Sequence, residues 1–233
     1  MNRLAVFVEG YTEVIFVTRL LEEIAGEKHV RIEWRKIQGG TKTKRSSALV
    51  RAAKPDTGQM YYVLVFDCGG DRLVKPRIVE EHANLTRKGY QRIIGLRDVR
   101  PDYSHTTMGD LLAMLKKYVK TSLIPVDFIL AVLEIEAWFL SETKHFAIID
   151  PAITVSAIKA ALGFDPEHDD MQQRLMPAED LSDCYAIGGK VYEKHNAQLT
   201  VNALQFEHVY MGLVNKLAPL KRLVEIIEEF LAS

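Results

Sequence analysis

The sequence predicts an α/β protein: a mostly parallel, Rossmann-like sheet flanked by helices, followed by a helical C-terminal lobe. Short apolar runs alternate with helical patterns through the first 140 residues. The run at 61–66 is apolar on both faces, which is typical of a central parallel strand. Strands that alternate with helices of this length indicate βαβ units around a parallel sheet.

Five strands are expected, each from a short apolar or alternating run. They cover residues 4–8, 30–37, 61–66, 92–96 and 127–133. Between them, the apolar spacing predicts helices over 17–24, 46–53, 77–88 and 109–119. In the C-terminal part, helices are expected over 151–163, 205–217 and 219–231, with an acidic, irregular stretch at 165–194. These patterns predict a domain over 1–140 and a helical lobe over 141–233.

The composition is that of an ordinary globular protein. With 30 Lys and Arg against 31 Asp and Glu, the net charge is −1, which excludes histone-like bulk binding to nucleic acid. Two cysteines are too few for a disulfide framework or a zinc ribbon, which favours a reducing, cytoplasmic setting. The longest apolar runs are far shorter than the roughly 20 residues that a spanning helix needs, so we expect no membrane contact. Oligomers remain possible.

Acidic residues follow four of the expected strands. Glu9, Asp67, Asp98 and Glu134 each come directly after an apolar run, or one residue later. The carboxyl ends of parallel strands lie along one edge of a sheet, where ligands bind. A cluster of carboxylates repels itself unless cations neutralise it, and hard oxygen ligands suit Mg²⁺ or Mn²⁺. The alternative is that strands end in polar residues because loops are wet.

Two local motifs surround these acids. Glu9-Gly-Tyr-Thr-Glu13 joins the first strand to its helix, and Asp67-Cys-Gly-Gly-Asp71 follows the third strand. Ordinary turn and capping chemistry accounts for much of both motifs. It does not account for an acid at the very end of an apolar strand.

Taken in this order, the motifs resemble the toprim domain of topoisomerases, DnaG-type primases and OLD-family (overcoming lysogenisation defect) nucleases. The form of residues 8–13 is closest to OLD-type and small stand-alone toprim proteins, and 95–98 and 133–140 resemble segments of the latter. The resemblance covers about residues 3–140. It implies a divalent-metal-dependent nuclease that hydrolyses phosphodiester bonds of DNA or RNA. One departure stands out: Gly69 occupies the place of the second Asp of the toprim signature, and the next acid is Asp71.

The resemblance also implies roles for individual residues. Glu9 and Asp67, helped by Asp71, would hold a first ion. Glu13 and one of Glu134 or Glu136 would serve a second ion, so that the pair activates water and stabilises the leaving oxygen. Asp98 is a further metal candidate at the same edge. Lys190 and Lys194 are the candidates for a catalytic cation, with solvated surface lysines as the alternative.

Nucleic-acid contact has its own candidate. Residues 31–51 hold seven basic residues against Glu33 alone, and Lys42, Lys44 and Arg45 lie in a Gly-containing loop that would contact phosphates. A solvated basic loop explains the same pattern.

OLD-type proteins carry an ATPase domain, whereas this sequence has no P-loop motif. The resemblance therefore implies a separate ATPase subunit, in an anti-phage defence system. Two alternatives to the nuclease stay open. One is a catalytically degenerate toprim module that binds nucleic acid or a partner protein, and the other is a nucleotide-binding α/β module.

Overall fold

The computed structural model describes residues 1–28, 30–39, 46–53 and 60–233, and it confirms the α/β fold. One sheet holds the strands in the order β3-β2-β4-β1-β5-β6. Their bounds are β1 Asn2–Val8, β2 Val30–Gln38, β3 Ser46–Arg51, β4 Tyr61–Asp67, β5 Arg92–Asp98 and β6 Val126–Ala131. β1 pairs in parallel with β4 and β5, and β2 with β4, whereas β3 is antiparallel to β2 at the edge.

The chain forms two compact units. The sheet unit comprises Met1–Arg97, Gly109–Leu130 and Glu225–Ser233, and the helical unit comprises Asp98–Met108 and Ala131–Val224. A simple division at residue 140 would give the last nine residues to the lobe. They belong to the sheet unit because the Tyr61 hydroxyl donates a hydrogen bond to the carbonyl of Leu231 and Asn2 donates one to the carbonyl of Ser233.

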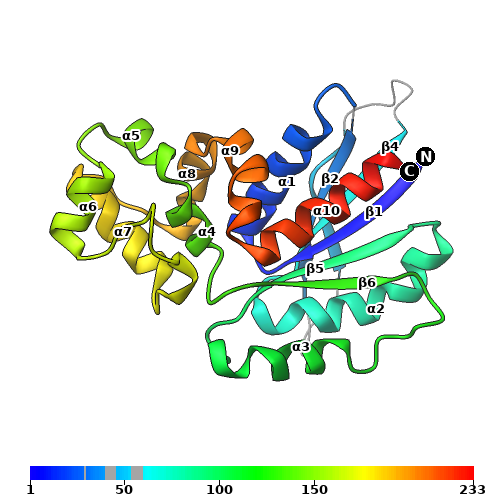
Figure 1. Ribbon diagram of the computed structural model, residues 1–233. Coiled ribbons are helices and arrows are strands. Elements are labelled where there is room, and N and C mark those ends of the chain that lie inside the picture. Colours follow the sequence, from blue (N-terminus) through cyan, green and yellow to red (C-terminus); the bar gives the residue numbers. More distant parts are fainter. Residues whose placement is uncertain (29, 40–45, 54–59) are drawn as a thin grey trace. The chain divides into compact units, whose positions relative to one another are not determined.

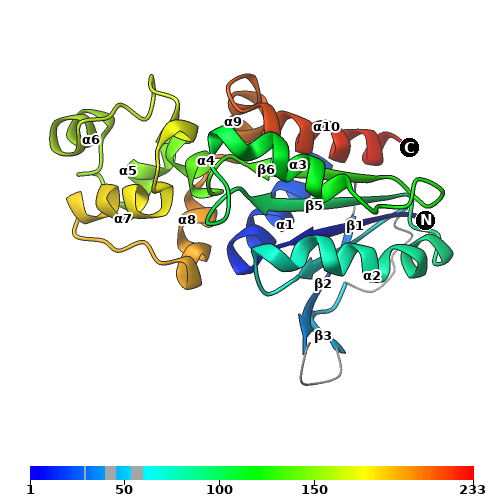
Figure 2. The same cartoon turned by 90° about the horizontal axis from the view of Figure 1, so that it is seen from below.

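Helices cover both faces of the sheet unit (Figures 1 and 2). α2 (Val74–Arg87) and α3 (Met108–Lys116) lie on one face, and α1 (Tyr11–Ala25) and the last turns of α10 (Ala218–Ala232) lie on the other. The α2 face packs tightly at Gly95, where a methyl group would come within 3 Å of Ile78 and Phe128. This close packing fixes the sheet whose carboxyl edge carries the predicted acids.

The helical unit is built from short helices. They are α4 Glu136–Ser141, α5 Phe146–Ile149, α6 Val155–Leu162, α7 Pro177–Ile187, α8 Ala197–Ala203 and α9 Phe206–Met211. α4 packs against α7, and α5 against α8. No helix among the described residues is long and apolar enough to cross a bilayer.

Three expected elements were wrong. Residues 46–53 were expected to be helical, but Ser46–Arg51 is the edge strand β3, where pairing with β2 overrides a short and ambiguous pattern. The stretch 165–194 contains helix α7, which begins with Pro177 and has acids in its first turn, as helix starts often do. The last strand stops at Ala131 rather than 133, because Leu133 has a φ of 61° and turns the chain.

A buried carboxylate, Glu142, organises the helical unit. It accepts hydrogen bonds from the backbone N–H groups of Lys144 and His145, and its Oε1 lies 2.9 Å from Nδ1 of His208. Burial raises the pKa of Glu142, but hydrogen bonds from His145 and His208 outweigh it and hold the pKa below its usual value.

A carboxyl whose pKa is depressed by folding stabilises the protein above its unfolded-state pKa of about 4.3, and this stability is lost as the pH falls through the folded-state value. We expect Glu142→Gln to lower the free energy of unfolding by about 1–3 kcal/mol at pH 7, and to flatten its decline in acid. Urea unfolding between about pH 7 and pH 3 measures both effects. The exposed Glu207→Gln is the control, and equal curves for the two variants would contradict the role of Glu142.

Candidate functional site

The first acidic group lies in the sheet unit, where β1 and β4 end side by side. Val8 is paired with Asp67 in the parallel register, and the N–H of Gly70 donates to the carbonyl of Glu9 at 2.8 Å. Gly69 and Gly70 have φ values of 78° and 141°, which side-chain-bearing residues rarely adopt. The two glycines thus fold the turn after β4 onto the turn after β1, and bring the backbones of Glu9 and Asp67 together.

Three carboxylates of this edge are buried. Glu9, Glu13 and Asp67 are 7%, 6% and 2% exposed. Glu13, in the first turn of α1, accepts a hydrogen bond from the N–H of Gly10 at 3.0 Å. Asp67 accepts one from the N–H of Gly69 at 2.9 Å. Such donors offset part of the free energy that burying a carboxylate costs.

One cation pairs with an acid of this edge, and a second influences the neighbouring Cys68. Lys36 is the residue of β2 in register with Asp67, and its Nζ lies 3.3 Å from Oδ2 of Asp67. Arg77, on α2, is almost fully buried and donates to the carbonyl of Gly39 at 3.2 Å. Sequence reasoning assigned neither to the site. The signals were the register of neighbouring strands for Lys36, and for Arg77 its position on the apolar face of its helix.

Burial and the neighbouring charges shift the pKa of the Cys68 thiol. Burial raises its pKa well above the usual range, and the carboxylates of Asp67 and Glu9 raise it further, while Arg77 acts in the opposite direction. Cys68 is fully buried and belongs to the hydrophobic core of the sheet unit.

The donors of this edge suit a hard divalent cation in kind, because all are carboxylate oxygens. Within the described ranges, however, no group of three or more acidic, histidine or cysteine side chains is arranged to hold a metal ion. Asp71 opens the 3₁₀ turn η1 (Asp71–Leu73), and its side chain is outside the described part. The predicted nucleic-acid contacts Lys42, Lys44 and Arg45 also lie outside the described residues.

The second acidic group lies in the helical unit and surrounds a lysine. Nζ of Lys194 is 3.2 Å from Oε1 of Glu134 and 3.6 Å from Oε2 of Glu136. Burial lowers the pKa of Lys194, but the charges of Glu136, Asp98 and Glu134 outweigh this and raise it well above its usual range. Asp98 itself accepts a hydrogen bond from the N–H of Ile135 at 3.0 Å.

The backbone explains how Glu134 and Glu136 both reach Lys194. Neither is on a strand: Glu134 follows the turn at Leu133, and Glu136 is the first residue of α4. Glu134 accepts a hydrogen bond from the N–H of Ala178, in the first turn of α7, at 3.1 Å. A carboxylate is favoured at that end of a helix.

Glu136 is the most deeply buried acid of this group. It is fully buried, and the Tyr192 hydroxyl donates to its Oε1 at 2.7 Å. Burial raises the pKa of Glu136, although Lys194 and Tyr192 oppose the shift. Sequence reasoning did not assign Tyr192 a role, although it lies between the two candidate lysines.

Lys190 is not part of this group. Its Nζ lies 3.6 Å from Oδ2 of Asp150, and both side chains are partly exposed. Of the two candidate lysines, the fold therefore places only Lys194 beside predicted acids.

We expect Lys194→Met to lower the free energy of unfolding of the helical unit by about 1–3 kcal/mol, because Glu136 would keep a buried charge without its cation. The effect stays below that of a fully buried pair because Lys194 is half exposed. Urea unfolding measures it.

Lys190→Met is the matched control and should change the free energy by no more than about 0.5 kcal/mol. Adding Glu136→Gln to Lys194→Met should restore much of the loss. Equal effects of the two lysine substitutions would contradict this account.

The whole chain was compared with protein-family models, curated proteins and solved structures, and nothing matched. Its function is therefore inferred from its own residues. The predicted acids form two groups: Glu9, Glu13 and Asp67 in the sheet unit, and Asp98, Glu134 and Glu136 with Lys194 in the helical unit.

Proposed function

We propose that the sheet unit is a divalent-metal-dependent nuclease that hydrolyses phosphodiester bonds of DNA or RNA. One observation carries the proposal: Glu9, Glu13 and Asp67 are buried at the adjoining carboxyl ends of β1 and β4. In open parallel sheets this is the edge where ligands bind. A cation would offset the cost of burying these carboxylates, and the resemblance of these motifs to the toprim domain supports the same proposal.

In this proposal Glu9 and Asp67 hold the cation, and Asp71 supplies the further donor that the described side chains do not provide. When bound, the ion supplies an activated water and charge stabilisation at the phosphate. Glu13 holds the N–H of Gly10 and thereby fixes the turn that carries Glu9. Lys36, half exposed beside Asp67, pairs with a phosphate oxygen as negative charge develops.

A second candidate function is a catalytically degenerate toprim module that binds nucleic acid or a partner protein. Internal cations favour it: Lys36 already neutralises Asp67, and Lys194 neutralises Glu134 and Glu136. Gly69, in place of a second Asp, removes one oxygen ligand from the turn. Such a module would bind its partner with or without a divalent ion.

The two functions differ in cleavage of supercoiled plasmid and of labelled single-stranded RNA in Mn²⁺, Mg²⁺ or EDTA. For the nuclease we expect metal-dependent cleavage that Glu9→Gln reduces by about 100-fold or more, as when a group that stabilises transition-state charge is removed. Glu27→Gln, an exposed acid of the same unit, is the matched control and should cleave like the wild type.

Metal binding has a separate readout. Mn²⁺ should raise the Tm of the wild type and of Glu27→Gln, because a ligand that binds only the folded state stabilises it, and should leave the Tm of Glu9→Gln unchanged. Cleavage that is indifferent to Glu9, or no cleavage on either substrate, would favour the degenerate module.

We further propose that the nuclease works with a separate ATPase subunit in anti-phage defence. The support is the likeness of residues 8–13 to OLD-type proteins, which carry an ATPase domain. Affinity purification of the tagged protein from its host, with and without phage infection, should co-purify an ATPase. Recovery of the tagged protein with no ATPase under either condition would contradict this partner.

A further inference from the structure

A basic aromatic patch lies on the sheet unit, outside the acidic edge. Tyr118 follows α3 and is 77% exposed. The ammonium groups of Lys117 and Lys75 lie 5.0 and 5.8 Å from the centre of its ring. Together with Lys116 and Lys120, these residues form the lysine–tyrosine patch.

Burial does not explain the position of Tyr118, whose ring contacts only the lysine side chains named above among the aromatic contacts of the described residues. Its φ is 67°, a left-handed conformation that costs a residue with a side chain free energy and that glycine or asparagine adopts more readily. An aromatic ring this exposed gains little from burial. Residues in strained backbone conformations are found more often at functional sites, which favours a ligand for the exposed ring.

The lysine–tyrosine patch is positively charged. Residues 111–126 contain three lysines and no acid. Among the ion pairs of the described residues, none includes Lys75, Lys116, Lys117 or Lys120. Burial and the nearby charge of Lys117 lower the pKa of Lys75, as expected where cations crowd together. The patch therefore attracts anions.

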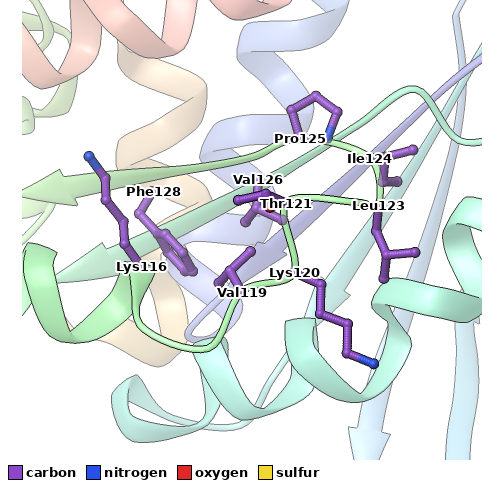
Figure 3. A pocket seen from close by; sticks show the side chains of 9 residues that line it. All are labelled: Lys116, Val119, Lys120, Thr121, Leu123, Ile124, Pro125, Val126 and Phe128. Atoms are coloured by element: carbon purple, nitrogen blue, oxygen red, sulfur yellow. The ribbon is translucent and has the colours of Figure 1, made fainter.

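An apolar pocket adjoins the patch (Figure 3). Its volume is about 470 Å³, within the usual range of small-ligand sites. Val119, Leu123, Ile124 and Phe128 contribute its apolar lining. Lys116 and Lys120 line it with their stems, and their ammonium groups point away from the apolar side chains (Figure 3). The pocket thus offers an apolar lining next to positive charge, which suits an apolar surface of a ligand that carries negative charge nearby.

We propose that the lysine–tyrosine patch binds single-stranded nucleic acid: a base stacks on Tyr118, a neighbouring base enters the pocket, and the lysines contact the phosphates. The identity of the ligand rests on the proposed nuclease function and narrows its substrate. A single strand is required because only an unstacked base offers its face to an aromatic ring. Stacking of this kind tolerates any base, so the patch binds without sequence preference.

Fluorescence anisotropy tests this with labelled single-stranded DNA and RNA of ~20 nucleotides, and with a duplex of the same length, in EDTA. We expect the wild type to prefer single strands. Tyr118→Gly should weaken single-strand binding about fivefold or more through loss of stacking, whereas Tyr118→Phe should bind like the wild type. The Tm of Tyr118→Gly should not fall, because glycine relieves the positive φ.

The contribution of the lysines is measured by the salt dependence of single-strand binding. Replacing Lys116, Lys117 and Lys120 by Gln should reduce the magnitude of the slope of log K against log salt by about 0.7 for each phosphate that a lysine no longer neutralises. Lys88→Gln, which removes one exposed charge of the same unit, should alter single-strand affinity much less than the triple variant and leave the Tyr118 effect intact.

The proposal is overturned if the wild type does not bind single strands, or if Tyr118→Gly binds them normally. It is also overturned if the Tm of Tyr118→Gly falls together with its affinity, since Tyr118 would then hold the loop. Binding of phosphatidylglycerol vesicles that the lysine variant abolishes, with normal oligonucleotide binding, would assign the patch to a membrane. Since EDTA prevents metal-dependent cleavage, patch-dependent binding without any cleavage in Mn²⁺ would refute only the proposed nuclease.

Discussion

Removing a carboxylate from water costs several kcal/mol unless donors or cations replace the missing hydration. This chain buries carboxylates in both of its units. Many of the neighbouring groups are hydrogen-bond donors or cations that replace the lost hydration. In the sheet unit, backbone N–H groups face Glu13 and Asp67, and Lys36 adds a positive charge. In the helical unit, Lys194 neutralises Glu136. In the proposed nuclease, a metal ion would meet the same requirement for positive charge at the sheet edge.

The two lysines solve this problem differently. Lys36 faces one buried carboxylate, that of Asp67, and its own side chain is half exposed. Lys194 lies among three acids that together raise its pKa, and one of them, Glu134, accepts a hydrogen bond from the N–H of Ala178 at the start of α7. The first arrangement thus leaves one side of the cation open to solvent, whereas the second surrounds the cation with acids.

The positions of most strands could be predicted from the sequence, because short apolar runs determine them. Strand ends followed from those runs, so the neighbouring positions of Glu9 and Asp67 could be expected. β3 could not, because nearly all its side chains are exposed and its residues show no alternation that distinguishes strand from helix. Contacts made across the fold, such as Tyr192 with Glu136 or Arg77 near Cys68, leave little mark on local spacing. Asp71 and the basic loop remain predictions.

The chain passes between its two units four times, at residues 97–98, 108–109, 130–131 and 224–225. Neither unit is therefore a continuous stretch of polypeptide. A fragment that stops near residue 140 would keep every described strand but lack residues 225–233. In that segment the carbonyl of Leu231 accepts hydrogen bonds from the Tyr61 hydroxyl and the Lys28 ammonium group. Dissecting this molecule by expressing pieces would remove supports from the piece that is kept, so its activities are separated by point substitutions in the intact chain.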